Sequence, residues 1–112
     1  MGKAHIAYIP GAEGRVIGLS KINRIVEHFS RRGAIQESLT MAIHKALNKV
    51  LKQTEGVMVV IQATHNCVSC RGVKHMGASM ITSEVSGAFA DHNKTAKQEV
   101  MHMIGYGLDA YK

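Results

Sequence analysis

Apolar and polar positions follow a helical period in two adjoining segments of the chain. In the first, apolar side chains recur at i, i+3, i+4 and i+7, as Ile22, Ile25, Val26 and Phe29. This spacing predicts one apolar face on a helix, with Ser20 as its N-cap and residues 31–33 at its end. Residues 35–52 carry the longest periodic stripe of the sequence, which begins at Ile35, and predict a second amphipathic helix.

Runs rich in β-branched residues predict the strands. Residues 56–62 (GVMVVIQ) are too short for a capped helix, so we expect a strand that is buried on both faces. Residues 4–9 and 15–18 flank a Pro- and Gly-containing turn and predict an N-terminal hairpin. Residues 79–89 alternate loosely between β-formers and small polar residues, which predicts a partner strand.

The last predicted element is a helix over residues 93–103, ended by Gly105 and Gly107. The expected order is therefore β-β-α-α-β-β followed by a C-terminal helix. Strands grouped around a helix pair favour an α+β fold, with an antiparallel sheet and helices on one face. A chain of 112 residues fits one domain, spanning residues 1–112.

Composition narrows the classes of function. The formal net charge is +6, which suits a polyanionic partner such as a nucleotide. Aromatic residues make up only 4%, so stacking platforms for nucleic acid are scarce and a nucleic-acid binder is disfavoured. No apolar run has a membrane-spanning length. Two cysteines three positions apart suit reduced thiols in the cytoplasm better than a disulfide framework.

Chemically active side chains concentrate in residues 63–72, which read ATHNCVSCRG. Alternation along a strand puts His65 and Cys67 on the same side, where they could ligate a metal or pair a base with a nucleophile. Cys67 and Cys70 form a Cys-x-x-Cys spacing that occurs in zinc sites and in redox motifs. Arg71 adds a fixed cation suited to phosphate or carboxylate.

Two further groups are candidates for nucleotide binding. Ser20 and Lys21 stand at a predicted helix start, where backbone N–H groups favour phosphate, and Arg24 follows Lys21 by one turn. A plain helix cap with solvated cations is the alternative. Gln36 and Glu37 open the second predicted helix, where they are either ordinary first-turn residues or a pair that reads a guanine edge.

Five blocks of the sequence resemble the GTP cyclohydrolase I family. They are residues 2–10 (GKAHIAYIP), 16–26 (VIGLSKINRIV), 35–40 (IQESLT), 63–67 (ATHNC) and 70–73 (CRGV). The match runs in order from Gly2 to about His102. The resemblance implies the tunnelling fold, in which β-β-α-α-β-β units assemble into a homo-oligomeric ring with active sites between subunits.

The resemblance also implies a reaction and roles for residues. The family converts GTP to 7,8-dihydroneopterin triphosphate and formate, with zinc activating a water molecule for attack on the purine C8. It implies that Cys67 is a zinc ligand and that His65 donates and accepts protons at the imidazole ring of the base. It implies that Gln36 and Glu37 recognise guanine. The implied triphosphate-binding residues are Ser20, Lys21, Arg24 and Arg71.

The sequence differs from the family pattern in its zinc ligands. The other two zinc ligands of the family, a cysteine and a histidine, precede the block that matches Gly2, as do the family's N-terminal helices. We therefore expect both to be absent from residues 1–112. Another polypeptide could supply the ligands, the protein could bind nucleotide without turnover, or His65, Cys67 and Cys70 could form a replacement site.

The expected function is accordingly that of a GTP cyclohydrolase I-type hydrolase whose activity is impaired or altered by the missing ligands. One alternative is a non-catalytic purine-nucleotide-binding module on the same fold. The other is a different tunnelling-fold enzyme that acts on a purine or pterin-like ring.

Overall fold

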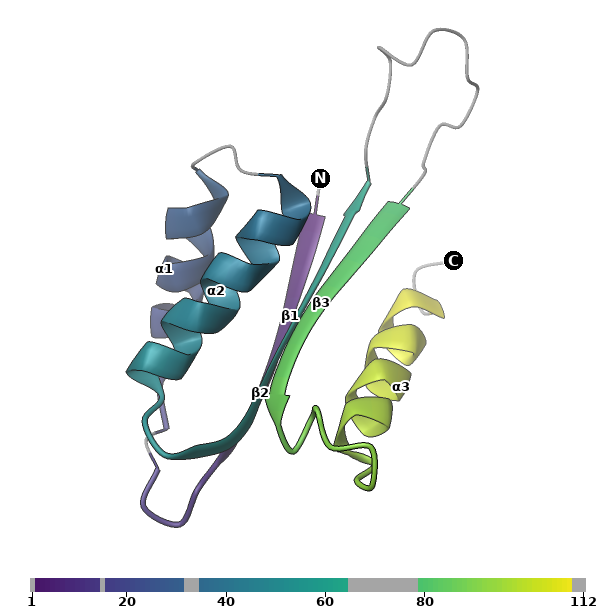
Figure 1. Cartoon of the computed structure of the whole chain (residues 1–112). Helices are drawn as coiled ribbons and strands as arrows, with labels where there is room; N and C mark the ends of the chain where they lie inside the picture. The colour runs from purple at the N-terminus through teal and green to yellow at the C-terminus, as the bar shows by residue number, and fades with distance from the viewer. Residues whose placement is uncertain (1, 15, 32–34, 65–78, 110–112) are drawn as a thin grey trace, which may run out of the picture.

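The structure, a computed structural model, describes residues 2–14, 16–31, 35–64 and 79–109. Figure 1 shows its elements in chain order, which are β1 (Gly2–Pro10), α1 (Leu19–Ser30), α2 (Gln36–Val50), β2 (Thr54–Thr64), β3 (Ser79–Gly87) and α3 (Ala96–Asp109). None of the helices in this described part is both long and apolar enough to cross a membrane.

The strands form one antiparallel sheet with β2 in the centre, in the order β1-β2-β3. Val59 pairs with Ile6 of β1 and with Glu84 of β3. Because neighbouring strand residues point to opposite faces, each face of the sheet receives every second side chain. The helices α1 and α2 pack on one face and α3 packs on the other (Figure 1). The predicted α+β class is confirmed, with the helix pair together on one face.

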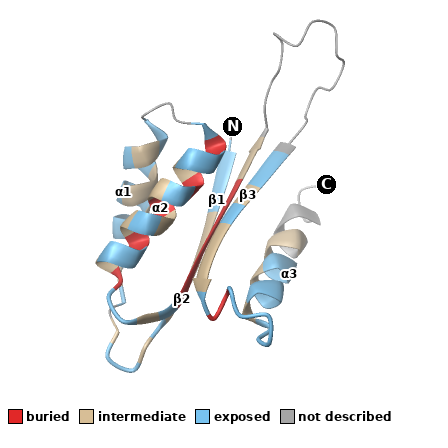
Figure 2. Ribbon diagram, in the orientation of Figure 1, coloured by how far each residue is buried: buried red, intermediate tan, exposed pale blue. Residues whose placement is uncertain are grey.

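The centre of β2 is the most deeply buried part of the sheet (Figure 2). Val57, Met58 and Val59 each have 0% exposure, although they alternate between faces. The prediction of a strand buried on both faces is confirmed. The buried cluster on the helix-pair side consists of Ile43, Leu47, Leu51, Val57, Val59 and Ile61, and the one on the α3 side of Met58, Val60 and Phe89.

The predicted N-terminal hairpin is wrong in its second strand. Residues 16–18 belong to no strand, and the side chain of Tyr8 supplies the hydrogen bonds that a strand neighbour would make. The Tyr8 hydroxyl donates to the Ile17 carbonyl at 3.3 Å and accepts from the Ile17 N–H at 3.2 Å. Both backbone groups of Ile17 are thereby satisfied without a ladder. The described order is β-α-α-β-β-α.

The predicted start of the first helix is also corrected. Gly18 is the N-cap of α1, and no side chain makes a capping hydrogen bond there within the described residues. Ser20 is therefore a first-turn residue and not the cap. The carbonyl of Gly18 instead accepts the first helical bonds from the N–H groups of Lys21 and Ile22.

Gly105 and Gly107 do not end the C-terminal helix, because α3 runs through both to Asp109. A glycine inside a helix costs about 1 kcal/mol relative to alanine, which packing can offset. Val100 and Ile104 supply that packing by contacting the buried cluster on the α3 side of the sheet.

Candidate functional site

The first turn of α2 is attached to the end of the sheet where β2 finishes and β3 starts (Figure 1). Gln36 is only 8% exposed there. Its side-chain amide nitrogen donates to the carbonyl of Ile61 at 3.0 Å and to that of Met80 at 2.9 Å. One acceptor belongs to β2 and the other to β3, so a single side chain fixes the helix start to both strands.

Glu37, the next residue, is exposed in the same turn. A carboxylate at a helix N-terminus is favoured by the helix dipole, so this position suits a charged group that faces outward. Strand β2 ends at Thr64, and His65 is the next residue in the sequence. The structure thus brings Gln36 and Glu37 to the strand end that continues into the predicted catalytic segment.

A cavity of about 400 Å³ lies beside Gln36, between the start of β1 and the facing ends of α1 and α2. This volume is near the lower limit of small-molecule pockets. The lining is mostly apolar, with Lys3 and Gln36 among its polar members. Its hydrophobic walls include Ala4, Val26, Leu39 and Ile61.

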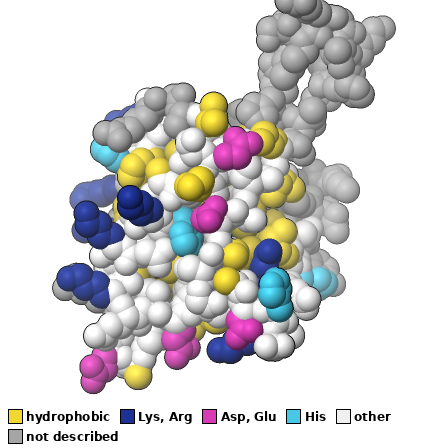
Figure 3. Space-filling model, in the orientation of Figure 1, with side chains coloured by type: hydrophobic (Ala, Val, Ile, Leu, Met, Phe, Trp, Pro, Cys, Tyr) yellow, Lys and Arg dark blue, Asp and Glu magenta, His cyan; other side chains and the backbone are white. Residues whose placement is uncertain are grey.

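The predicted phosphate-binding residues of α1 are all exposed, as Ser20, Lys21 and Arg24. No acidic residue occupies the first turn of this helix. An uncapped N-terminus with two cations within its first two turns has the charge and the donors that an anion requires. Figure 3 shows Lys and Arg side chains gathered on the side of the molecule formed by the helix pair.

The two predicted binding groups lie at opposite ends of the helix pair. Ser20 and Lys21 begin α1, whereas Gln36 and Glu37 begin α2, which returns antiparallel to α1 (Figure 1). The 12 residues of α1 separate them, and a helix of that length spans about 18 Å. Within one chain, the structure therefore does not bring the two groups together.

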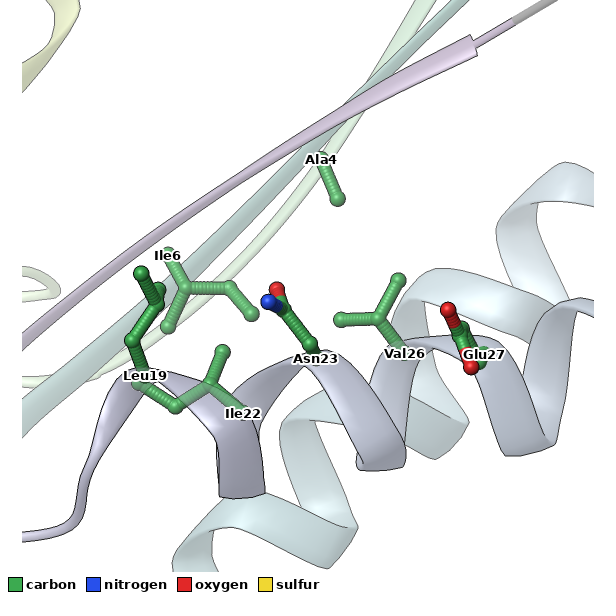
Figure 4. A pocket seen from close by; sticks show the side chains of 7 residues that line it. All are labelled: Ala4, Ile6, Leu19, Ile22, Asn23, Val26 and Glu27. Atoms are coloured by element: carbon green, nitrogen blue, oxygen red, sulfur yellow. The ribbon is translucent and has the colours of Figure 1, made fainter.

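A groove of about 320 Å³ runs between β1 and α1 (Figure 4). Its lining includes Ile6 from the strand and Leu19, Ile22 and Asn23 from the helix. Ser20, Lys21 and Arg24 are not among its lining residues. Leu19 is 73% exposed at its rim. The groove is therefore mainly apolar and distinct from the cationic face of the helix.

The remaining predicted site residues lie outside the described residues; they are His65, Cys67, Cys70 and Arg71. Within the described ranges, no group of three or more His, Cys, Asp or Glu side chains could hold a metal ion. The described side chains alone therefore form no such cluster, and the cysteines proposed as zinc ligands lie outside the described ranges.

Two residues of the site end were missed by sequence reasoning. Thr40 is 1% exposed, and its hydroxyl lies 2.6 Å from the hydroxyl of Thr82 on β3. The spacing offered a signal for Thr40, because it follows Gln36 by one helical turn on the same face. Thr82 offered none, because its role depends on strand register.

Comparison with known proteins identifies the family of the chain. Residues 1–105 match the family model for GTP cyclohydrolase I. The chain is 50% identical over 105 residues to GTP cyclohydrolase 1 1 of Pseudomonas aeruginosa, covering 94% of this chain and 54% of the relative. It is 47% identical over 109 residues to GTP cyclohydrolase 1 2 of Nostoc sp., covering 97% and 49%, respectively.

A third relative, GTP cyclohydrolase 1 of Flavobacterium johnsoniae, is 53% identical over 91 residues, covering 81% of this chain and 40% of the relative. The chain spans about half the length of the curated relatives it matches. A family match over nearly the whole chain agrees with the α+β architecture and with the helix pair on one face of the sheet. The chain therefore belongs to the GTP cyclohydrolase I family.

Proposed function

We propose that this protein acts on GTP as a hydrolase, forming 7,8-dihydroneopterin triphosphate and releasing formate. The observation that carries the proposal is the position of Glu37. This carboxylate is exposed on a helix turn that Gln36 fixes to the ends of β2 and β3. A carboxylate in that position can accept two N–H bonds from a guanine edge, and His65 follows the end of β2 as the proposed proton donor and acceptor.

Gln36 and Glu37 form the guanine-recognition pair of this proposal. The amide nitrogen of Gln36 already donates to protein acceptors. Its hydrogens are consequently committed, and we assign the reading of the base N–H groups to Glu37. Gln36 contributes by holding that carboxylate in place.

The triphosphate is bound by Ser20, Lys21, Arg24 and Arg71 in this proposal. Ser20 and Lys21 lie at the opposite end of the helix pair from Glu37, and Arg24 lies midway along α1, so within one chain these residues are not gathered around Glu37. We infer that the nucleotide lies between copies in a ring-shaped homo-oligomer, with base and phosphates held by different copies. Large apolar side chains exposed near the two helix starts support such contacts, namely Val16 (74%), Leu19 (73%) and Ile35 (69%).

Zinc is the proposed cofactor, and it would supply activated water for attack on the purine. Cys67 is the proposed zinc ligand, and Cys70 is a candidate second ligand. The remaining donors would come from outside residues 1–112. Zinc content of the purified protein and of Cys70→Ala separates these options. We expect a lower zinc content in Cys70→Ala if the replacement site exists, and equal zinc would exclude Cys70.

The activity itself is tested by incubating the protein with GTP and Zn²⁺. We expect formate release together with pterin fluorescence, and neither product from His65→Ala. Retained turnover in His65→Ala would contradict its assignment. We place the protein in the cytoplasm, where GTP is available and its thiols stay reduced.

A matched pair of variants tests the binding roles. Glu37→Ala should weaken the binding of GTP by about tenfold or more and leave the binding of UTP unchanged. The reason is that a hydrogen bond to a charged group is worth about 1.5–3 kcal/mol. Arg71→Ala should weaken the binding of both triphosphates equally and leave the binding of guanosine unchanged. Isothermal titration calorimetry measures these affinities, and equal loss of GTP and UTP in Glu37→Ala would show that it does not read the base.

A second function, nucleotide binding without turnover, is favoured by one observation. Glu37 and the α1 residues Ser20, Lys21 and Arg24 are exposed, and their proposed contacts with base and phosphates need no metal. Under this alternative, the protein binds GTP with the preferences above but yields no formate at any zinc concentration. The same two assays therefore decide between the enzyme and the binding module.

A further inference from the structure

A buried polar network joins α2 to β3 beside Glu37. Thr40 donates its hydroxyl hydrogen to the carbonyl of Gln36 at 2.8 Å. The Thr40 and Thr82 hydroxyl oxygens are 2.6 Å apart, and the Gln36 amide nitrogen lies 3.2 Å from the Thr82 hydroxyl. Gln36 and Thr40 are both buried, and Thr82 is half-buried.

The number of hydrogens fixes the direction of these bonds. Each threonine hydroxyl carries one hydrogen, and Thr40 gives its own to the Gln36 carbonyl. Thr82 must therefore donate to Thr40, and its lone pairs face the Gln36 amide. The two amide hydrogens of Gln36 are shared among Thr82 and two strand carbonyls. Each member of the network thus has at least one hydrogen-bond partner, as expected for a buried polar cluster that specifies position.

We propose that Thr82, acting through Thr40 and Gln36, is a positioning residue for guanine recognition by Glu37. The inference rests on the proposed function, because it assumes that Glu37 reads the base. Thr82 touches no nucleotide in this account. It fixes the first turn of α2 against β3, and a small displacement of a binding group is enough to weaken an aligned pair of hydrogen bonds.

The same helix and strand offer an internal control. His44 and Ser86 form a second polar link between α2 and β3, with the His44 Nε2 atom 3.1 Å from the Ser86 hydroxyl. His44 follows Gln36 by eight residues, which corresponds to about 12 Å along the helix. Loss of this second link disturbs the interface between the same two elements at a distance from Glu37.

The test compares GTP with ITP, which lacks the 2-amino group that Glu37 would bind. Calorimetric titrations in zinc-free buffer give both affinities for wild type, Thr82→Val, Thr82→Ser and Ser86→Ala. We expect the preference for GTP over ITP to fall about fivefold in Thr82→Val, the effect of losing one net hydrogen bond. Thr82→Ser keeps the hydroxyl and should restore the preference, and Ser86→Ala should retain it. Affinity for inorganic triphosphate should remain unchanged in all variants.

An undiminished GTP preference in folded Thr82→Val, or an equal reduction in Ser86→Ala, would overturn the positioning role. Wild type without any GTP preference would instead refute the proposed reading of the base by Glu37, so the two failures are distinguishable. Should Thr82→Val not fold, Thr40→Val against Thr40→Ser provides the same comparison from the helix side. A retained preference in Thr40→Val would then overturn the proposal.

Discussion

The two faces of the sheet are packed differently. The face under α1 and α2 buries six apolar residues in one cluster, whereas the cluster under α3 contains three. The two faces also differ in whether their buried polar atoms have hydrogen-bond partners. Gln36 and Thr40 on the helix-pair side have hydrogen-bond partners, but His5 Nε2 and Gln62 Oε1 are buried without one among the described residues. Ile81, which pairs with Gln62 and shares its face, is 53% exposed.

The comparison shows that hydrogen bonds on the helix-pair face fix the position of α2, whereas α3 mainly covers apolar surface on the other face. A buried polar atom without a partner costs about 1–3 kcal/mol, so among the described residues the unfavourable contributions of this kind lie on the α3 face. The helix-pair face also holds the turn that presents Glu37. We infer that this face provides most of the stability and all of the described positioning of the candidate site.

The largest expected effect comes from opening the helix-pair core. Leu47→Ala removes a side chain with 0% exposure and should destabilise the protein by about 3 kcal/mol. Val100→Ala, on the half-buried face of α3, should cost only about 1 kcal/mol. Urea unfolding at matched protein concentration measures both. Equal decreases in the free energy of unfolding would show that the two faces contribute equally to stability.

A smaller effect is expected at the contact that replaces the second strand of the predicted hairpin. Tyr8→Phe leaves the ring in place and removes the hydroxyl that bonds both backbone groups of Ile17. We expect the free energy of unfolding to fall by about 1 kcal/mol, the typical net value of such a hydrogen bond in a partly buried site. The midpoint of thermal unfolding reports it, and an unchanged midpoint would mean that water replaces the hydroxyl without cost.

The smallest effect is a pH dependence on the α3 face. Burial, and then the charge of Lys3, lower the pKa of His5 below its ordinary value of 6.5. The unfolded chain therefore takes up this proton first as the pH falls, so stability decreases below about pH 6.5. Unfolding free energies measured between about pH 5 and 8 should fall more steeply for wild type than for His5→Gln. Parallel curves would contradict the assignment.

The local elements could be predicted because their signals are local. The helix pair and the buried strand at residues 56–62 each follow from periodicity within a few turns or a few residues. The candidate site was only partly predictable. Glu37 could be proposed from the sequence, but the apolar stripe pointed to Ile35 as the first core position of α2. The structure leaves Ile35 69% exposed and buries Gln36 in its place.

By itself, the sequence determined the α+β class, the helix pair and the family to which the chain belongs, because periodic patterns and contiguous motifs do not depend on distant contacts. Tertiary structure alone decided that a tyrosine replaces a strand beside Ile17, and that the two binding groups lie at opposite ends of the helix pair. It also decided which polar residues are buried. Gln36 meets Thr82 across 46 positions of sequence, and only the packing of α2 on β3 brings such partners within hydrogen-bonding distance.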